Sequence, residues 1–253
     1  MLESLLQVLE GNGLVTAFLF VGGLVWLSYE LSNRLTGGRL HGSAVAITLA
    51  LVLAWIGGAV TGGNRGVADF AVLSGVGVLG GAMFRDLAIV ATAFGVHPEE
   101  LRRAGAVGAA SVLIGVVLSF VVGALVAVAF GYRDAVAIST IGAGAATYIV
   151  GPVTGTALGA DSAVIALSVA AGLTKSVLVM VGTPFVAGLI GLTTPQAAMI
   201  YGGLMGTTSG VAGGLAATDP ALVPYGAMTA TFYTGLGCLL APSVLFLIVR
   251  ALT

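Results

Sequence analysis

The sequence contains little charge. Of its 253 residues, 8% are Asp, Glu, Lys or Arg, whereas 58% are hydrophobic. A soluble domain carries about 25% charged residues, so this chain could not cover a water-facing surface. A bilayer requires no such cover, because roughly 20 apolar residues in a helix span its hydrocarbon core of about 30 Å. The composition therefore predicts an all-α polytopic membrane protein and argues against a soluble enzyme.

Other features are scarce or missing as well. The single cysteine, Cys238, can form neither an internal disulfide nor a zinc site. A net charge of −1 gives no basic surface for nucleic acid. The sequence has no Walker loop, no HExxH motif and no His/Cys metal cluster, which argues against ATP-driven transport by this chain alone and against metal-dependent proteolysis. We therefore expect neither enzymatic activity nor a cofactor.

Long apolar blocks alternate with short polar breaks along the whole chain. The blocks cover residues 11–33, 43–61, 66–96, 104–131, 134–160, 162–191, 194–217 and 225–250. Their lengths leave room for about six to eight membrane crossings. The pattern predicts one multi-pass transmembrane domain over residues 1–253, in contact with the lipid bilayer.

Glycine is abundant, with 40 residues in the chain, about twice the usual share of 7%. Most of these glycines are explained by close packing of membrane helices, which small residues permit. In blocks 134–160 and 194–217, however, glycine is clustered with Pro and Thr, and a helix should break there. Broken backbone at membrane depth is tolerated only when it is buried in protein or lines a cavity. We therefore predict two broken, re-entrant hairpins.

The two glycine-rich blocks look like copies separated by about 60 residues. The matching pairs include Ile141-Gly142 with Tyr201-Gly202, Thr147 with Thr207, and Asp161 with Asp219. These matches predict two repeat-like units, at about residues 103–161 and 162–219. If each block enters and leaves the membrane on one face, the units are inverted and the hairpin tips meet near the midplane, as in secondary transporters. If each block crosses fully, the units are parallel; we favour the inverted arrangement.

The predicted tips carry groups that suit a small anion and a cation. Backbone N–H groups at broken-helix N-termini bind carboxylates, and nearby hydroxyls, including that of Thr154, add donors. The candidate substrate-binding residues at the tips are Gly144, Thr147, Tyr148, Gly206, Thr207, Thr208 and Ser209. The candidates for holding Na⁺ through oxygen atoms are Gly142, Gly202, Asp161 and Asp219. The two aspartates have an alternative role as helix N-caps.

A few charged residues lie inside apolar blocks. Lys175 is midway along residues 163–190, where a charge costs about 2.5–3.5 kcal/mol and usually faces a cavity or a partner. We expect Lys175 to bind the anionic substrate or to couple conformations; the alternative is a structural pair with an acid. Arg85 and Asp86 interrupt the third block and mark either an interfacial helix end or a contact with substrate or a partner subunit.

Four runs of sequence carry a resemblance to a known family. They are residues 85–96, 140–155, 202–220 and 223–235. With these runs, and over essentially its whole length, the sequence resembles the larger (M) subunit of the two-subunit bacterial malonate:sodium symporters.

This resemblance implies import of malonate coupled to Na⁺, with protons as an alternative coupling ion. It also implies a smaller membrane partner, the L subunit, and a place in the bacterial inner membrane. The glycine-rich pair is similar to the hairpins of citrate- and glutamate-type sodium symporters, which work by an elevator motion; this second likeness is an analogy of fold. Transport of another small carboxylate, or a passive anion channel, remain alternatives. Malonate is largely a dianion near pH 7, so two hairpin tips and Lys175 could meet its two carboxylates.

Overall fold

The computed structural model describes residues 2–37, 42–79 and 98–253, and every regular element in these ranges is helical. The chain forms two compact units, Met1–Phe94 and Gly95–Thr253. The predicted all-α membrane fold is thereby confirmed. The single transmembrane domain over residues 1–253 stays a prediction. Arg85 and Asp86 lie outside the described residues.

The first unit is built on two long apolar helices that pack against each other, α2 (Gly13–Thr36) and α3 (Gly42–Thr61). The remaining elements of this unit are α1 (Leu2–Gly11), the 3₁₀ turns η1 (Gly66–Asp69) and η2 (Ala71–Leu73), and α4 (Gly75–Leu79). Asp69 accepts a hydrogen bond from the backbone N–H of Arg65 and forms an ion pair with its side chain, which closes the loop after α3.

The second unit contains three long segments and two pairs of short helices. The long segments are α6 (Pro98–Ala129), α9 (Ser162–Val186) and α12 (Val223–Leu240), the last continued by a π-helical turn, η4 (Ala241–Leu245), and by α13 (Phe246–Leu252). The short pairs are α7 (Ala135–Ala146) with α8 (Val150–Leu158), and α10 (Pro195–Met205) with α11 (Thr208–Ala216). A short 3₁₀ turn, η3 (Pro220–Leu222), precedes α12.

Five segments of the described chain are long and apolar enough to cross a membrane. They are Gly13–Thr36, Ala44–Leu73, Gly105–Ala129, Ser162–Val186 and Pro220–Leu252. Large apolar side chains on their surfaces, such as Leu125 and Leu178, are exposed. Such faces suit contact with lipid, because lipid tails are as apolar as leucine. The predicted third block, 66–96, lies mostly outside the described residues.

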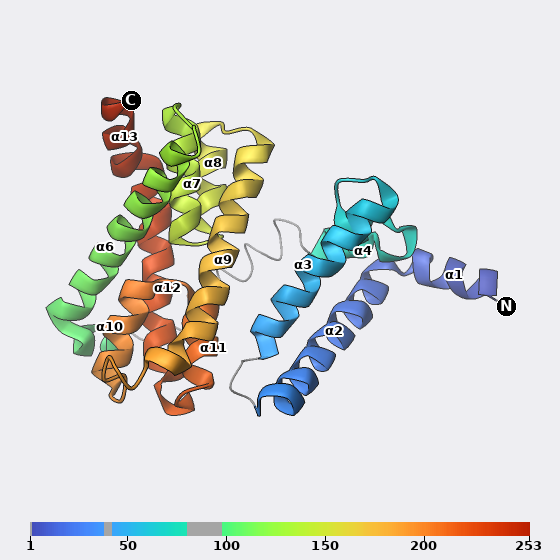
Figure 1. Cartoon of the computed structure of the whole chain (residues 1–253), viewed down its shortest axis with the longest axis horizontal. Helices are drawn as coiled ribbons and strands as arrows, with labels where there is room; N and C mark the ends of the chain where they lie inside the picture. The colour runs from blue at the N-terminus through green and yellow to red at the C-terminus, as the bar shows by residue number, and fades with distance from the viewer. Residues whose placement is uncertain (1, 38–41, 80–97) are drawn as a thin grey trace. The chain divides into compact units, whose positions relative to one another are not determined.

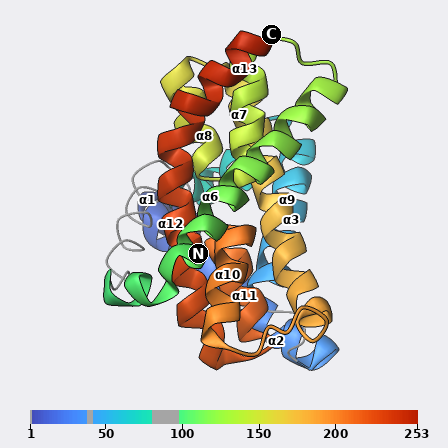
Figure 2. The ribbon, with the colours of Figure 1, turned by 90° about the vertical axis from the view of Figure 1, so that its left-hand side faces the viewer.

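The two short pairs are helical hairpins at opposite ends of the second unit. Figures 1 and 2 show α7 and α8 together at one end and α10 and α11 together at the other, with α9 running between the ends. Each pair is therefore a helical hairpin; that the hairpins are re-entrant in the membrane stays a prediction. The chain breaks at Thr147–Ile149 in the first hairpin and at Gly206–Thr207 in the second, where the sequence predicted the tips.

Matching side chains begin the two hairpins. The Asp134 carboxylate accepts hydrogen bonds from the backbone N–H groups of Val136 and Ala137 and caps α7. Sixty positions later, the Thr194 hydroxyl accepts from the N–H of Ala197 and caps α10. Such caps satisfy donors that the first helical turn leaves without a partner. The start of each hairpin is thus fixed locally.

Candidate functional site

Helix α9 presents a narrow face of small residues to both hairpins. Ser168, Gly172 and Ser176 are spaced by four, so they lie on one side of the helix, and all are buried. A Cβ atom at Gly172 would overlap the backbone nitrogen of Tyr148 in the first tip. A Cβ atom at Gly210, on α11, would lie 2.7 Å from the carbonyl oxygen of Ser176. Small residues at these positions let both hairpins approach α9 backbone to backbone.

Consecutive residues of α9 contact the two hairpin tips. The Lys175 ammonium donates a hydrogen bond of 2.9 Å to the carbonyl oxygen of Ala146, the last residue of α7. The hydroxyl of Ser176 is hydrogen-bonded to that of Thr207, between α10 and α11. Both residues lie near the middle of α9, which has 25 residues and is thus about 37 Å long. The two tips therefore contact adjacent residues near the middle of a helix long enough to cross a membrane.

Lys175 has uncharged partners. Its ammonium donates to Ser119 Oγ at 2.9 Å, to the Ala146 carbonyl and to the Tyr233 hydroxyl at 3.2 Å, which accounts for its three donors. It also lies 4.9 Å from the centre of the Tyr233 ring. Within the described ranges no carboxylate forms an ion pair with Lys175, and the ion pairs found there are both in the first unit. A lysine ammonium in an apolar helix without a counter-ion among the described residues can bind an anion.

Tyr233 joins α12 to the other parts of the site. Its side chain is fully buried, and its hydroxyl donates a hydrogen bond of 3.1 Å to the carbonyl oxygen of Gly115 on α6. The oxygen is therefore free to accept from Lys175. The Tyr233 ring lies against Gly206, where a Cβ atom would overlap the ring and where φ is +70°. Glycine adopts this conformation without strain. Tyr233 thus holds Lys175 and the second tip together.

The two tip threonines act as N-caps. Thr147 Oγ1 accepts hydrogen bonds from the N–H groups of Ile149 and Val150 at 3.2 and 3.1 Å, at the start of α8. Thr207 Oγ1 accepts from the N–H of Gly210 at 3.4 Å, at the start of α11. Each hydroxyl therefore shapes its tip, as expected for an N-cap with a Thr side chain.

Replacing Thr147 by valine should destabilise the first tip, because the two N–H groups lose their acceptor in a buried place. We expect a loss of about 1 kcal/mol, equivalent to a fall in Tm of about 2–4 °C for a protein of this size. Thermal unfolding of the purified protein in detergent measures it. Thr174→Val is the matched control, because Thr174 is exposed and its hydroxyl bonds only to Ala170 of its own helix. Equal Tm values for the two variants would contradict the capping role.

The second tip retains donors for an anion. The backbone N–H groups of Thr208 and Ser209 begin α11, and neither has an acceptor in the part of the chain that the structure describes. The Ser209 hydroxyl is also buried without a hydrogen-bond partner there. Because the N-terminus of a helix carries partial positive charge, these groups favour a negatively charged ligand.

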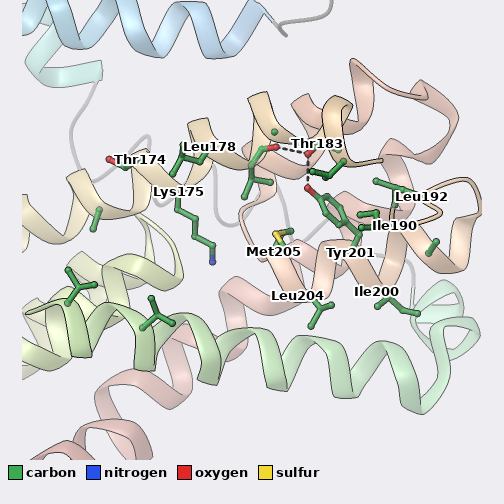
Figure 3. Close-up of a pocket in the computed structure, with 17 residues that line it drawn as sticks. Thr174, Lys175, Leu178, Thr183, Ile190, Leu192, Ile200, Tyr201, Leu204 and Met205 are labelled. Carbon is green, nitrogen blue, oxygen red and sulfur yellow. Dashed lines mark hydrogen bonds between the residues drawn. The ribbon is translucent and has the colours of Figure 1, made fainter. Parts of the chain in front are cut away.

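A pocket of about 1020 Å³ lies beside Lys175. It is lined mainly by apolar side chains of α6, α9 and α10, and Figure 3 shows Lys175 extending from α9 toward α6. Further along the pocket, the hydroxyls of Thr183 and Tyr201 form a 2.7 Å hydrogen bond. Lys175 is the charged residue of this lining, so an anion that enters the pocket has one cation to bind.

The predicted coupling-ion residues lie elsewhere. Gly142 packs α7 against Phe120 of α6, and Gly202 packs α10 against α12 at Gly226.

Asp161 accepts from the N–H of Val164 at 2.9 Å, and Asp219 accepts from that of Ala221 at 3.0 Å. Both aspartates are exposed helix caps and are not brought to the tips. Over the described ranges, no three His, Cys, Asp or Glu side chains gather to hold a metal. A cation bound within these ranges would therefore need hydroxyl and carbonyl oxygens as its ligands.

The structure brings most of the other predicted residues together. Lys175, Thr147, Tyr148, Gly206, Thr207, Thr208 and Ser209 lie at or beside the two tips, and Gly144 packs one helical turn away, against Ser168.

Sequence reasoning missed Ser119, Ser176 and Tyr233. The four-residue spacing of Ser168, Gly172 and Ser176 on an apolar helix could have indicated the packing face. No local signal marks Ser119 or Tyr233, because their roles depend on contacts between helices.

The sequence matches a known protein family. Residues 5–253, nearly the whole chain, match the family described as "Malonate/sodium symporter MadM subunit". No curated protein and no solved structure matches the sequence. The family match confirms the resemblance found in the sequence, and it makes the chain a multi-pass subunit of a transporter. The chain therefore belongs to the MadM subunit family of malonate/sodium symporters.

Proposed function

We propose that this chain binds malonate between the two hairpin tips and carries it across the membrane together with Na⁺ by alternating access. The observation that carries the proposal is the position of Lys175. Its ammonium lies at the middle of a membrane-spanning helix, bonds to the first tip, and has no counter-ion among the described residues. A charged residue within a membrane span often marks a substrate pathway, and a cation near two broken-helix tips suits an anionic substrate.

Malonate offers two carboxylates on one methylene group. One carboxylate would pair with Lys175, because a charge-assisted hydrogen bond is about twice as strong as one to the uncharged oxygens of Ser119, Ala146 and Tyr233. The other would accept from the free donors of Thr208 and Ser209 at the N-terminus of α11. Substrate would thus take the place of one hydroxyl partner of Lys175 and link the second tip to α9, while the bond from Lys175 to the Ala146 carbonyl of the first tip is kept.

The two hairpins would serve as gates of inverted units, 103–161 and 162–219. Three correspondences support two copies of one unit: Asp134 and Thr194 cap the first helices, Thr147 and Thr207 cap the second, and the hairpins lie at opposite ends. In inverted repeats, movement of one unit against the other exposes a midplane site to each side in turn. An elevator-like motion is the form we favour.

The complete transporter would also contain the smaller L subunit and would lie in the bacterial inner membrane. The family description calls this chain a subunit, which supports a partner. The exposed apolar faces of the described helices leave ample surface for another membrane protein as well as for lipid.

Uptake of labelled malonate into proteoliposomes tests this proposal. The vesicles would contain this chain alone or with the small subunit, under an inward Na⁺ gradient. We expect saturable uptake that needs both chains and stops when the Na⁺ gradient is collapsed. Flux that does not saturate and persists without a gradient would indicate a passive channel, and uptake of other carboxylates only would refute malonate as the substrate.

Chemical labelling tests the position of the anion directly. Lys175 is the only lysine in the sequence, so an amine-reactive reagent can modify this residue and the N-terminal amine, and peptide mass analysis separates the two. Malonate should slow the labelling of Lys175 and leave that of the N-terminus unchanged. Equal labelling with and without saturating malonate would contradict binding at Lys175.

A further inference from the structure

Two buried hydroxyls in the first hairpin have no hydrogen-bond partner. Thr140 lies on α7 and Thr154 on α8, and both residues have an exposed fraction of 0%. Neither hydroxyl oxygen has a partner in the part of the chain that the structure describes. A threonine inside a helix can bond to a carbonyl of its own preceding turn, as Thr174 and Thr231 do here. Two such threonines on facing arms of one hairpin are candidates for binding a ligand, since an unpartnered buried hydroxyl needs an explanation and a bound ion is one.

The two threonines lie in the same layer of the hairpin. Because the tip is centred near Thr147, positions 140 and 154 are equally far from it along the two antiparallel arms. The packing supports this register, since a Cβ atom at Gly155 would lie 2.8 Å from Thr140 Cγ2. In the next layer toward the tip, Gly151 lies against the backbone of Gly144.

A third hydroxyl, on α9, lies in this next layer, beside Gly151 and Gly144. Ser168 is also fully buried, and a Cβ atom at Gly151 would overlap its Oγ atom. The Ser168 hydroxyl donates a hydrogen bond of 2.7 Å to the carbonyl oxygen of Ile165. The side chain of Ile165 packs against Gly155. The Ser168 oxygen therefore retains lone pairs directed away from its own proton. Hydroxyl groups from three helices thus lie within two adjacent layers of this hairpin, together with helix carbonyls that each keep a second lone pair.

We propose that Thr140, Thr154 and Ser168 form a site for the coupling Na⁺ between α7, α8 and α9. This inference rests on the proposed Na⁺-coupled transport and adds the place of the cation. A hard cation prefers oxygen ligands, whether charged or uncharged. The layers that hold Thr140, Thr154 and Ser168 offer oxygens and contain no lysine or arginine that would repel a cation. A bound Na⁺ would hold the two arms of the first hairpin against α9, one to two helical turns from Lys175 and its anion. Cation and substrate would then stabilise the same closed arrangement of this hairpin, which is the reciprocity that coupling requires.

The test replaces each threonine by valine, which keeps the shape and removes the oxygen. In proteoliposomes with the partner subunit, we expect Thr140→Val and Thr154→Val to raise the Na⁺ concentration for half-maximal malonate uptake by roughly tenfold or more. The KM for malonate at saturating Na⁺ should change little. Choline replaces Na⁺ in the titration, so that ionic strength stays constant.

Ser139→Ala is the matched control. Ser139 lies on the same helix, is equally buried and also has an unpartnered hydroxyl in the described chain, but it points about 100° away from Thr140. Its half-maximal Na⁺ concentration should equal that of the wild type. Thr154→Ser retains the oxygen and removes a methyl group, so its half-maximal Na⁺ concentration should also equal that of the wild type.

A second measurement covers variants that lose uptake. Na⁺ alone, without malonate, should raise the Tm of the purified wild-type complex and of Ser139→Ala, but not that of the two valine variants. Wild-type Na⁺ dependence in both valine variants would overturn the site and leave Na⁺-coupled transport intact. Wild-type uptake that ignores Na⁺ would instead refute the coupling itself, and with it this site.

Discussion

Replacing Lys175 by methionine should raise the apparent KM for malonate by roughly ten- to a hundredfold. A hydrogen bond to a charged group contributes about 1.5–3 kcal/mol, and each 1.4 kcal/mol is a factor of ten in affinity. The protein should nevertheless fold at least as well as the wild type. A charge in the middle of a membrane helix costs about 2.5–3.5 kcal/mol, and the uncharged methionine avoids this cost. Loss of transport without loss of stability is the expected signature of a binding residue.

Two measurements separate this role from a structural one. Uptake kinetics in proteoliposomes give the KM, and thermal unfolding in detergent gives the stability. Tyr233→Phe is the companion variant, because it keeps the buried ring against Gly206 and removes the hydroxyl that accepts from Lys175. Its KM should rise less than that of Lys175→Met, since the cation remains. An unchanged KM in Lys175→Met would remove this residue from the site, and a large fall in Tm would assign it to the structure instead.

Replacing Gly172 by alanine should abolish most malonate uptake. The added methyl group would overlap the backbone nitrogen of Tyr148 and the adjacent Cα atom. Backbone atoms cannot turn aside as a flexible side chain can, so the whole first tip must move away from α9. That movement separates the Ala146 carbonyl from Lys175. Overpacking of this kind costs about 1–3 kcal/mol, and we expect both a lower Tm and uptake reduced by more than tenfold, since the site requires both tips.

Gly235→Ala is the matched control for this prediction. Gly235 lies inside α12, away from the pocket, and an added Cβ atom would meet nothing within 4 Å. Alanine is favoured over glycine in a helix by about 1 kcal/mol, so this variant should be as active as the wild type and at least as stable. If Gly172→Ala were equally active and stable, the first tip would not pack on α9 as closely as the structure shows.

The sequence by itself determined the class of the protein and the places where its helices break. The share of charged residues indicates whether a protein surface faces water or lipid. A chain with 8% charged residues can expose its helices only to lipid. The breaks at Thr147 and Gly206–Thr207 were also predictable, because glycine, proline and threonine act on their own backbone within a turn or two. Lys175 was identified from depth alone, since a charge in an apolar block is costly wherever the helix packs.

Only the tertiary structure decided what surrounds Lys175. Ser119 and Tyr233 are 56 and 58 positions away along the chain, and several faces of α6 and α12 are apolar enough to meet either lipid or protein. In a membrane, apolar residues do not distinguish a buried face from an exposed one, because lipid and protein interior are equally apolar. Close packing of small residues makes that choice, as Gly172 and Gly206 do here. Which helices meet is therefore a property of the assembled fold, whereas where each helix breaks is a property of the local sequence.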